Sequence, residues 1–395
     1  MSSGKTAHAI ASGLLLAGIF LQGGAISLRA QQVSATQSPT RLQALLIEGS
    51  SDLQRDDDAG AEKTFRQALA LAPRSVEILN NLAIALAKQG KLKEAIPLYK
   101  RALTLRPRDL ATKRNLAIAY FKKQDYARAL PLLESLSRRE PKDFQAADLA
   151  GLSYFGLDRY SEAAKHLERA SSLKPDDLPT LYMLGQAYLR SENYKQVTDV
   201  FARIMVIDPK SAEAHVMMGT AYDKMFQQPK AVEEYQAAAQ ANPDFPGVHS
   251  GLGLLYWKQD EVDRAEAELQ EELKQFPTDP VSNCLLGEIA IRKNRLEDAR
   301  ARFLAAIEVN PRYKEALFGL GKTEIKLGHP DEGVGPLRKA LELDPDYAEA
   351  HFQLGNALTL LGQTEEARKE RAISAAIQAK RQEEYTRKLR GKIEP

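Results

Sequence analysis

The sequence predicts an all-α chain built from repeated helical hairpins, and two observations lead to this prediction. Prolines occur at positions 73, 107, 141, 175, 209, 243, 277, 311 and 345, so each follows the last by 34 residues. The segment from Asn80 to Asp109 carries two apolar stripes at helical spacing, with Gly90 between them. A hairpin of that size is too small to bury its own apolar faces, so its copies must pack against one another.

Small residues recur at two places in each repeat, which is a third observation. If the repeats are counted so that this proline is residue thirty-two, the first begins at Leu42 and the tenth at Ala348. The eighth place holds Gly or Ala in all ten repeats, and the twentieth holds Ala in all but two, where Val197 and Gly333 stand. Small side chains let two helix backbones approach closely, so we expect the two helices of each repeat to cross at these places.

Each repeat also carries signals that end one helix and begin the next. The proline cannot donate the next backbone hydrogen bond, and it disfavours helical angles in the residue before it. A short polar residue that can cap the following helix comes one or two positions later. These predicted caps are Ser75, Asp109, Asp143, Asp177, Ser211 and Asp279.

The residues at places four, seven, eight, eleven, twenty, twenty-four, twenty-seven and thirty-two resemble the tetratricopeptide repeat, whose pattern is Trp-Leu-Gly-Tyr-Ala-Phe-Ala-Pro. The repeat from Leu178 shows the pattern in Leu181, Leu184, Gly185, Tyr188, Phe201 and Pro209. This resemblance runs from Leu42 to about Ser374. It implies a right-handed superhelical solenoid of ten tandem repeats at 42–375, followed by a charged C-terminal helix or tail at 376–395 that covers the end of the stack.

Three places depart from the pattern. The first repeat has Glu48 and Asp52 where large apolar residues are usual, which is typical of a polar cap. Glu272 stands where a small residue is usual. The segment from Gly328 to Leu337, "GHPDEGVGPL", puts two prolines and three glycines around the start of a second helix, so we expect a looser joint there.

The N-terminus has the layout of a secretory signal peptide. Lys5 and His8 precede an apolar run from Ile10 to Leu21, and small residues follow, with cleavage expected after Ala25 or Ala30. The run is shorter than the roughly 20 residues that span a bilayer, which favours removal over an uncleaved anchor. The sequence therefore predicts a signal peptide at 1–30, a flexible leader at 31–41, and an exported protein that is periplasmic or secreted, without membrane insertion after signal removal.

Composition excludes several kinds of function. Lys plus Arg number 55 against 53 for Asp plus Glu, and this balance argues against a nucleic-acid partner. The single cysteine, Cys284, permits neither an intramolecular disulfide nor a multi-cysteine metal site, and we expect it to be a small buried hydrophobe.

The sequence shows no motif for catalysis or for a cofactor. The segment "GKT" at Gly321 to Thr323 resembles part of a phosphate loop, but it lies inside a predicted helix and lacks the upstream glycine. His215, His249 and His351 share the fourth place of their repeats, where large packing residues are usual, so we expect core roles rather than metal ligands. The sequence predicts no enzyme, no cofactor and no metal site.

Binding is the better supported role. In the tetratricopeptide repeat family, places two, five, nine, twelve and thirteen of the first helices face a concave groove. The resemblance therefore implies a partner-binding groove of aromatic, aliphatic and mostly basic residues, which suits an extended peptide or a partner helix. Its predicted members are Leu152, Phe155, Tyr182, Gln186, Arg190, Trp257, Lys258, Arg292, Phe318, Lys322 and Phe352.

One binding mode of the family is missing. Members that grip a C-terminal carboxylate use a set of lysines, asparagines and an arginine, and here Asn81 and Asn115 stand without the required lysines. We therefore expect an exported scaffold that binds other proteins or peptides in its concave groove, in the assembly of an envelope complex. The alternative is a non-catalytic accessory subunit of an enzyme or of a polysaccharide or lipid export machine.

Overall fold

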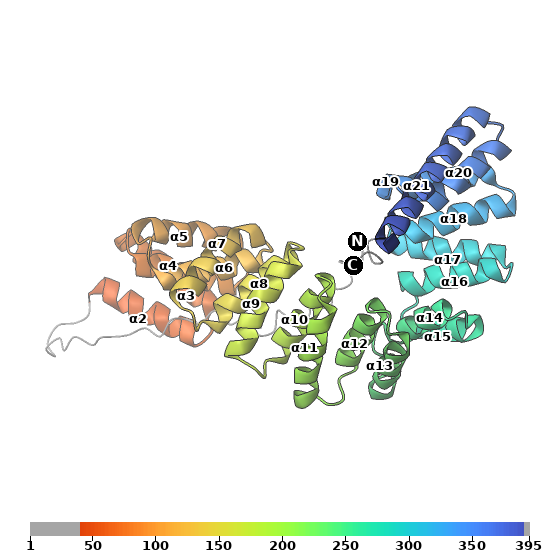
Figure 1. Ribbon diagram of the computed structural model, residues 1–395. Helices are drawn as coiled ribbons and strands as arrows, with labels where there is room; N and C mark the ends of the chain where they lie inside the picture. Colours follow the sequence, from red (N-terminus) through yellow and green to blue (C-terminus); the bar gives the residue numbers. More distant parts are fainter. Residues whose placement is uncertain (1–39, 391–395) are drawn as a thin grey trace. The chain divides into compact units, whose positions relative to one another are not determined.

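The computed structural model describes residues 40–390, which form twenty α-helices and no strand (Figure 1). Contacts divide them into two compact bodies, an N-terminal body of residues 40–209 and a C-terminal body of residues 210–390, and each is described by itself. The predicted signal peptide and residues 31–39 of the leader lie outside the described residues. Within residues 40–390, no helix has the length and apolarity that crossing a bilayer requires.

The helices follow one another as consecutive pairs in both bodies. Those of the N-terminal body are α2 (Arg41–Gln54), α3 (Asp58–Leu71), α4 (Val76–Lys88), α5 (Leu92–Leu105), α6 (Leu110–Lys122), α7 (Tyr126–Arg139), α8 (Phe144–Gly156), α9 (Tyr160–Leu173), α10 (Leu178–Arg190) and α11 (Tyr194–Ile207). Those of the C-terminal body are α12 (Ala212–Lys224), α13 (Gln228–Ala241), α14 (Val248–Lys258), α15 (Val262–Gln275), α16 (Pro280–Arg292), α17 (Leu296–Val309), α18 (Lys314–Leu327), α19 (Pro330–Leu343), α20 (Ala348–Leu360) and α21 (Thr364–Arg390).

The predicted stop and start signals act as expected. The second helix of each pair from α3 to α19 ends two residues before its proline, as α3 ends at Leu71 before Pro73. All six predicted caps accept a hydrogen bond from the backbone N–H three residues later, as Ser75 does from Ile78. The all-α fold of helix-turn-helix pairs is therefore confirmed.

The turn inside each pair has one constant backbone feature, which is a left-handed residue at the fifteenth place of the repeat. The residues with positive φ at this place are Asp56, Gly90, Gln124, Asp158, Glu192, Phe226, Asp260, Asn294, Gly328 and Gly362. Most are glycine or short polar residues, which tolerate that conformation best. Gln124 and Glu192 are longer polar residues, and Phe226 is the one apolar residue at this place, with φ at 58° and 89% of its surface exposed.

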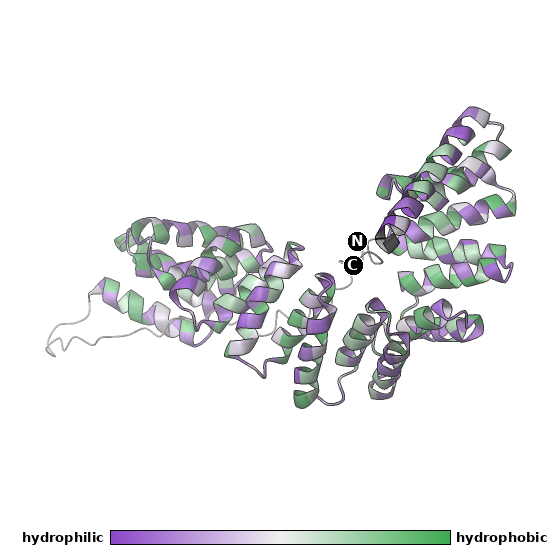
Figure 2. Ribbon diagram, in the orientation of Figure 1, coloured by the Kyte–Doolittle hydropathy of each residue, from purple (hydrophilic) through white to green (hydrophobic). Residues whose placement is uncertain are grey.

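The small residues at the eighth place are needed for close packing of the two helices. A Cβ atom at Gly151 would lie 2.6 Å from Cγ of Leu167, and one at Gly287 would lie 2.7 Å from the ring of Phe303. Both large neighbours are fully buried and lie sixteen residues after their glycine. Apolar residues accordingly alternate with polar ones around the helices (Figure 2), and the apolar ones fill the space within and between pairs.

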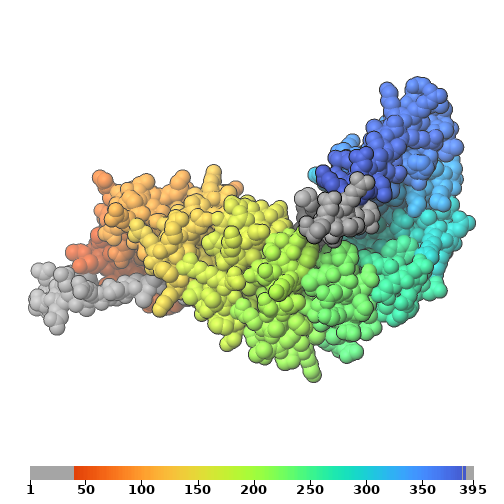
Figure 3. Space-filling view, in the orientation of Figure 1, coloured from red at the N-terminus to blue at the C-terminus, as the bar shows by residue number. Residues whose placement is uncertain are grey.

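The first helices of the pairs form the inner layer of each body. In the C-terminal body α12 contacts α14, α14 contacts α16, α16 contacts α18 and α18 contacts α20, and the first helices of the N-terminal body make the same series. In a curved stack of helix pairs, the helices on the inside of the curve lie closer to the equivalent helices of the neighbouring pairs than the outer helices do. The space-filling view shows that the pairs of each body pack as continuous layers, red to yellow-green and green to blue (Figure 3).

The segment from Gly328 to Leu337 is packed closely, so the prediction of a looser joint there is wrong. Pro330 is the first residue of α19, where its missing N–H breaks no helical bond. Gly328 ends α18 in the left-handed conformation with φ at 87°. A Cβ at Gly333 would lie 2.8 Å from the backbone oxygen of Gly321, so the two glycines allow α18 and α19 to approach more closely than a side chain would permit.

Of the three acidic departures from the pattern, Glu48 is exposed, whereas Asp52 and Glu272 are buried and partnered. Asp52 is 6% exposed, and its carboxylate accepts a hydrogen bond of 2.8 Å from Arg55. Glu272 is 3% exposed, and it accepts hydrogen bonds from the backbone N–H groups of Gly247 at 2.9 Å and Ser250 at 3.1 Å. Because Gly247 precedes α14 in a left-handed conformation, Glu272 caps a helix that begins two residues later than its equivalents.

The chain ends in one long helix, α21, whose first half is the second helix of the last pair. Near the end of this half, Ser374 donates a hydrogen bond of 2.8 Å to the backbone oxygen of Ala348, and in the second half Arg381 donates one of 2.8 Å to that of Asp346. The stretch of α21 from Ser374 to Arg381 therefore lies along the start of α20.

Candidate functional site

The predicted groove residues fall into two groups, because the two bodies are separate. Leu152, Phe155, Tyr182, Gln186 and Arg190 belong to the N-terminal body, and the other six belong to the C-terminal body. All lie on first helices, which form the inner layer of each body.

The N-terminal group offers little free surface. Leu152 is only 6% exposed, so it packs within the body and is removed from the set that can contact a partner. Phe155 is half-buried and makes an edge-on contact with Tyr160, with ring centroids 5.1 Å apart. Tyr182, Gln186 and Arg190 are partly buried, and Tyr182 and Arg190 have interaction partners within the protein.

The C-terminal group contains an aromatic cluster that two lysines border. The Phe318 ring on α18 lies 5.0 Å from the ring of Tyr347, which precedes α20. Lys322 lies 5.9 Å from the centre of the Phe318 ring, and Lys314 lies 5.0 Å from that of Tyr347. We call these four residues the aromatic cluster. Burial raises the pKa of the Tyr347 hydroxyl above its ordinary value, so this side chain stays neutral and can donate a hydrogen bond.

Two further predicted aromatics flank this cluster in sequence. Trp257, at the end of α14, is partly buried, and the guanidinium of Arg292 lies 5.8 Å from its ring centre. Phe352, on α20, is 47% exposed. It is therefore the most open of the predicted aromatic residues.

The basic residues of the C-terminal group are already paired with acids. Lys258 donates hydrogen bonds of 2.7 Å to both carboxylate oxygens of Asp223. Lys322 lies 3.3 Å from Glu288, and Arg292 forms an ion pair with Asp260. Each acid comes from the preceding repeat, so these side chains join one repeat to the next. The positive charge of these three residues, which the sequence predicts to face a partner, is thus largely neutralised within the protein.

The sequence reasoning did not pair these basic residues with acids, and it missed Tyr347, although the repeat contains a signal for some of the pairs. Basic residues stand at the thirteenth place in most repeats, and Lys88 pairs with Asp56 at 2.6 Å just as Arg292 pairs with Asp260. In both pairs the acid stands at the fifteenth place of the previous repeat. Comparing these two places between neighbouring repeats would have found the pairs.

The three histidines at the fourth place also have acidic partners. Nδ1 of His215 lies 2.7 Å from Glu234, Nδ1 of His249 lies 2.7 Å from Glu268, and His351 makes the same contact with Glu370. These are packing positions near the core, as expected. Cys284 is buried, and Gly321 to Thr323 lie within α18, also as expected.

Two shallow surface cavities among the described residues lie outside the predicted groove. A shallow surface cavity of about 400 Å³ is lined by Gly90, Lys91, Leu92, Lys93, Glu94 and Lys123, none of which belongs to the predicted set.

Comparison with solved structures finds distant neighbours. A chain of the APC/C hetero-tetramer Cut9–Hcn1 is 14% identical over 86% of this chain and 94% of that chain, with a TM-score of 0.47. Yeast Tom70 is 15% identical over 86% of this chain and 96% of that chain, with a TM-score of 0.45. YrrB, described as a TPR protein with an unusual peptide-binding site, is 21% identical over 50% of this chain and 97% of that chain, with a TM-score of 0.43.

No curated protein matches the sequence. Family models of the tetratricopeptide repeat match residues 86–152 and 154–221, residues 48–109 and 284–332, and residues 337–369, and a further TPR repeat model matches residues 227–260. These matches cover most of the described helix pairs. Such repeats typically form non-catalytic scaffolds for protein interaction. The chain therefore belongs to the tetratricopeptide repeat family.

Proposed function

We propose that this protein is an exported, non-enzymatic scaffold that binds a protein or peptide on the inner face of its first helices, in the assembly of a complex of the bacterial envelope. The observation that carries the binding proposal is the aromatic cluster, together with Phe352 on the next first helix. Phe352 is exposed, whereas Phe318 and Tyr347 are partly buried against the core and keep part of their surface open. Aromatic side chains grouped on one face are the usual anchors of a protein interface. The predicted signal peptide supports export to the periplasm or beyond.

The paired charges of the inner face indicate how a partner is recognised. Because Lys258, Arg292 and Lys322 already contact acids, apolar contacts with the aromatic side chains must supply most of the affinity. We therefore expect partner binding that changes little with salt concentration. A peptide with apolar anchors fits this surface better than a highly acidic one.

The test is affinity capture with the exported chain, followed by binding measurements on each captured protein. A variant with Trp257, Phe318 and Phe352 changed to alanine should bind at least ten-fold more weakly while its helical circular dichroism is unchanged. The matched control changes Val206 and Phe226 to alanine, because both are highly exposed apolar residues outside the inner-face places. Equal binding by the two variants would contradict the inner-face proposal.

Export is tested separately, by fractionating cells that produce the full chain. The mature protein should leave the cytoplasm and begin after Ala25 or Ala30, as mass spectrometry of its N-terminus would show. Retention in the cytoplasm with an intact N-terminus would contradict export and leave the binding test unaffected. Capture of an enzyme whose activity depends on this chain would instead support the accessory-subunit alternative.

A further inference from the structure

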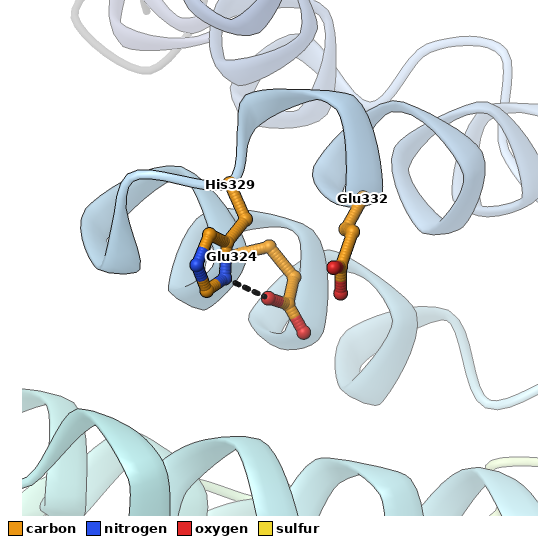
Figure 4. Close-up of side chains that lie close together, drawn as sticks. All are labelled: Glu324, His329 and Glu332. Atoms are coloured by element: carbon orange, nitrogen blue, oxygen red, sulfur yellow. Dashed lines mark ion pairs between the residues drawn. The ribbon is translucent and has the colours of Figure 1, made fainter.

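A cluster of possible metal ligands lies at the turn between α18 and α19, outside the inner-face set (Figure 4). It consists of Glu324 in α18, His329 just before α19, and Glu332 in the first turn of α19. One ligand atom from each residue lies within 4.8 Å of the others. We propose that these three side chains bind a divalent transition-metal ion, with Zn²⁺ the best match to the donor set.

The backbone of the turn brings the three residues together. Gly328 ends α18 in the left-handed conformation and reverses the chain, and the N–H of His329 donates a hydrogen bond of 2.9 Å to the backbone oxygen of Glu324. The imidazole then points back towards the Glu324 carboxylate, while Glu332 extends from the next helix towards the same side (Figure 4). The ligand positions therefore depend on a fixed turn rather than on flexible side chains alone.

The carboxylate of Glu324 supplies the second observation that points to a ligand. This residue is 3% exposed, yet its Oε2 atom is buried without a hydrogen-bond partner. Buried carboxylate oxygens in proteins are normally partnered, so this atom needs an explanation. Oε2 lies 3.6 Å from Nδ1 of His329, which is too far for a hydrogen bond. Two ligands on one tetrahedral Zn²⁺ ion, with bonds of about 2.0 to 2.2 Å, lie roughly that far apart.

The other His–Glu contacts of this chain show that the wide spacing is specific to this cluster. His215 and His249 approach their glutamates to 2.7 Å, which is an ordinary hydrogen bond and leaves no room for an ion. The eleventh place of the repeat, which Glu324 occupies, holds Tyr120, Tyr154, Tyr188, Tyr222 and Tyr256 in five consecutive repeats. A buried carboxylate at this place is therefore no requirement of repeat packing.

Arg300 binds one oxygen of each carboxylate. Its Nε donates a hydrogen bond of 2.7 Å to Oε1 of Glu324, and its Nη2 donates one of 2.7 Å to Oε2 of Glu332. One oxygen of each carboxylate stays available to the ion. A group that orients metal ligands in this way is a common outer partner of metal sites. Two carboxylates against one guanidinium leave a net negative charge, which a divalent cation would balance.

The ligand set indicates the class of metal and its role. Imidazole with carboxylates suits Zn²⁺ and similar ions, whereas Ca²⁺ and Mg²⁺ prefer sites made of oxygen ligands alone. Three protein ligands leave a fourth tetrahedral position for water or a donor from another molecule. A bound ion would join the end of α18 to the start of α19 and stabilise this helix pair.

The test is Zn²⁺ binding to the full chain without a polyhistidine tag, measured by isothermal titration calorimetry. We expect one ion per chain and a higher unfolding temperature in the presence of Zn²⁺. His329→Ala and Glu324→Gln should each weaken binding by at least ten-fold and abolish the thermal shift. The matched control is His249→Ala, which removes a histidine from a simple His–Glu pair and should bind Zn²⁺ like the native chain.

Two results would overturn the proposal. One is the absence of Zn²⁺ binding by the native chain, and the other is equal binding by the native chain and His329→Ala. Because the His329 side chain is 47% exposed, its replacement should leave the fold intact, which circular dichroism checks. If Glu324→Gln does not fold, anomalous diffraction from native crystals soaked in Zn²⁺ decides the matter, since the ion must lie between Glu324 and His329.

Discussion

Nδ1 of His249 lies 2.7 Å from Oε2 of Glu268, and this contact joins the two helices of one repeat, α14 and α15. Both side chains are mostly buried, with 17% and 28% of their surface exposed. The same contact recurs between His215 and Glu234, and between His351 and Glu370, always nineteen residues apart. In three repeats, the same histidine–glutamate contact thus joins the two helices.

This contact predicts a measurable coupling between the two residues. In a double-mutant cycle with His249→Ala and Glu268→Ala, we expect the free energies of unfolding to show an interaction of about 0.5 to 1.5 kcal/mol, because the two groups are in contact and only partly solvated. Urea unfolding at pH 7 gives the four values. The control cycle pairs His249→Ala with Glu308→Ala, an exposed residue on α17. Additive effects in the first cycle would contradict the prediction.

Asp148 predicts a pH dependence of the N-terminal body. Its carboxyl accepts a hydrogen bond of 3.1 Å from Thr180 and lies near Asp177. Burial raises the pKa of Asp148 to about 7, and the charge of Asp177 adds to the rise. Between about pH 4 and pH 7 the folded chain therefore holds a proton that the unfolded chain has lost. Raising the pH through this range favours unfolding, so this residue lowers stability as the solution approaches neutrality.

Replacing Asp148 by Asn should remove that dependence, since the amide keeps an oxygen for Thr180 and carries no charge. We expect Asp148→Asn to be more stable than the native chain at pH 8 and nearly equal to it at pH 4, as urea unfolding would measure. Asp176→Asn, which changes an exposed carboxylate of the same body, is the control and should show no such difference. A variant that is less stable than the native chain at pH 8 would refute the assignment.

Glu272 predicts local fraying of α14. Burial raises the pKa of its carboxyl, while the backbone N–H groups of Gly247 and Ser250 act in the opposite direction. Glu272→Ala would leave these two donors without a partner and should cost about 1 to 2 kcal/mol. Hydrogen exchange at residues 248–252 should become faster, whereas Glu272→Gln, which retains an acceptor oxygen, should show a smaller effect. Equal exchange in both variants would exclude the capping role.

Replacing Phe226 by a residue that tolerates its backbone conformation should stabilise the protein. It adopts a left-handed conformation that costs a bulky residue about 1 kcal/mol or more, and its exposed ring gains little from burial. Asn294 stands at the equivalent place with φ at 56°. Phe226→Asn should therefore raise the free energy of unfolding by about 1 kcal/mol, and Phe226→Val should lower it because a β-branched residue tolerates this conformation poorly. If Phe226→Val unfolds at a higher temperature than Phe226→Asn, the backbone at this position is not strained.

Local signals in the sequence predicted most of the fold. The proline at the thirty-second place ends the second helix because it cannot donate the next backbone hydrogen bond. The side chain of Ser75 or Asp109 caps the helix that follows it. These effects need no knowledge of the neighbouring repeat. The error at Gly328 to Leu337 arose because prolines and glycines were interpreted as breaks, whereas Pro330 begins a helix and Gly333 permits close packing.

The site was harder to predict, because its properties depend on contacts between repeats. The sequence identified Phe318, Lys322 and Phe352 as inner-face residues but did not show that Lys322 contacts Glu288, 34 residues earlier. The histidines were recognised as packing residues without their glutamates. The metal proposal depends on the 3.6 Å spacing between Glu324 and His329, which only coordinates reveal.

The ion pairs between neighbouring repeats have a mechanical consequence. Asp223 with Lys258, Asp260 with Arg292, and Glu288 with Lys322 each span one boundary along the inner layer of the C-terminal body. These pairs therefore oppose the separation of neighbouring repeats when the C-terminal body is stretched. Because dissolved salt screens such partly exposed charges, we expect the force needed to extend this body to fall as the ionic strength rises.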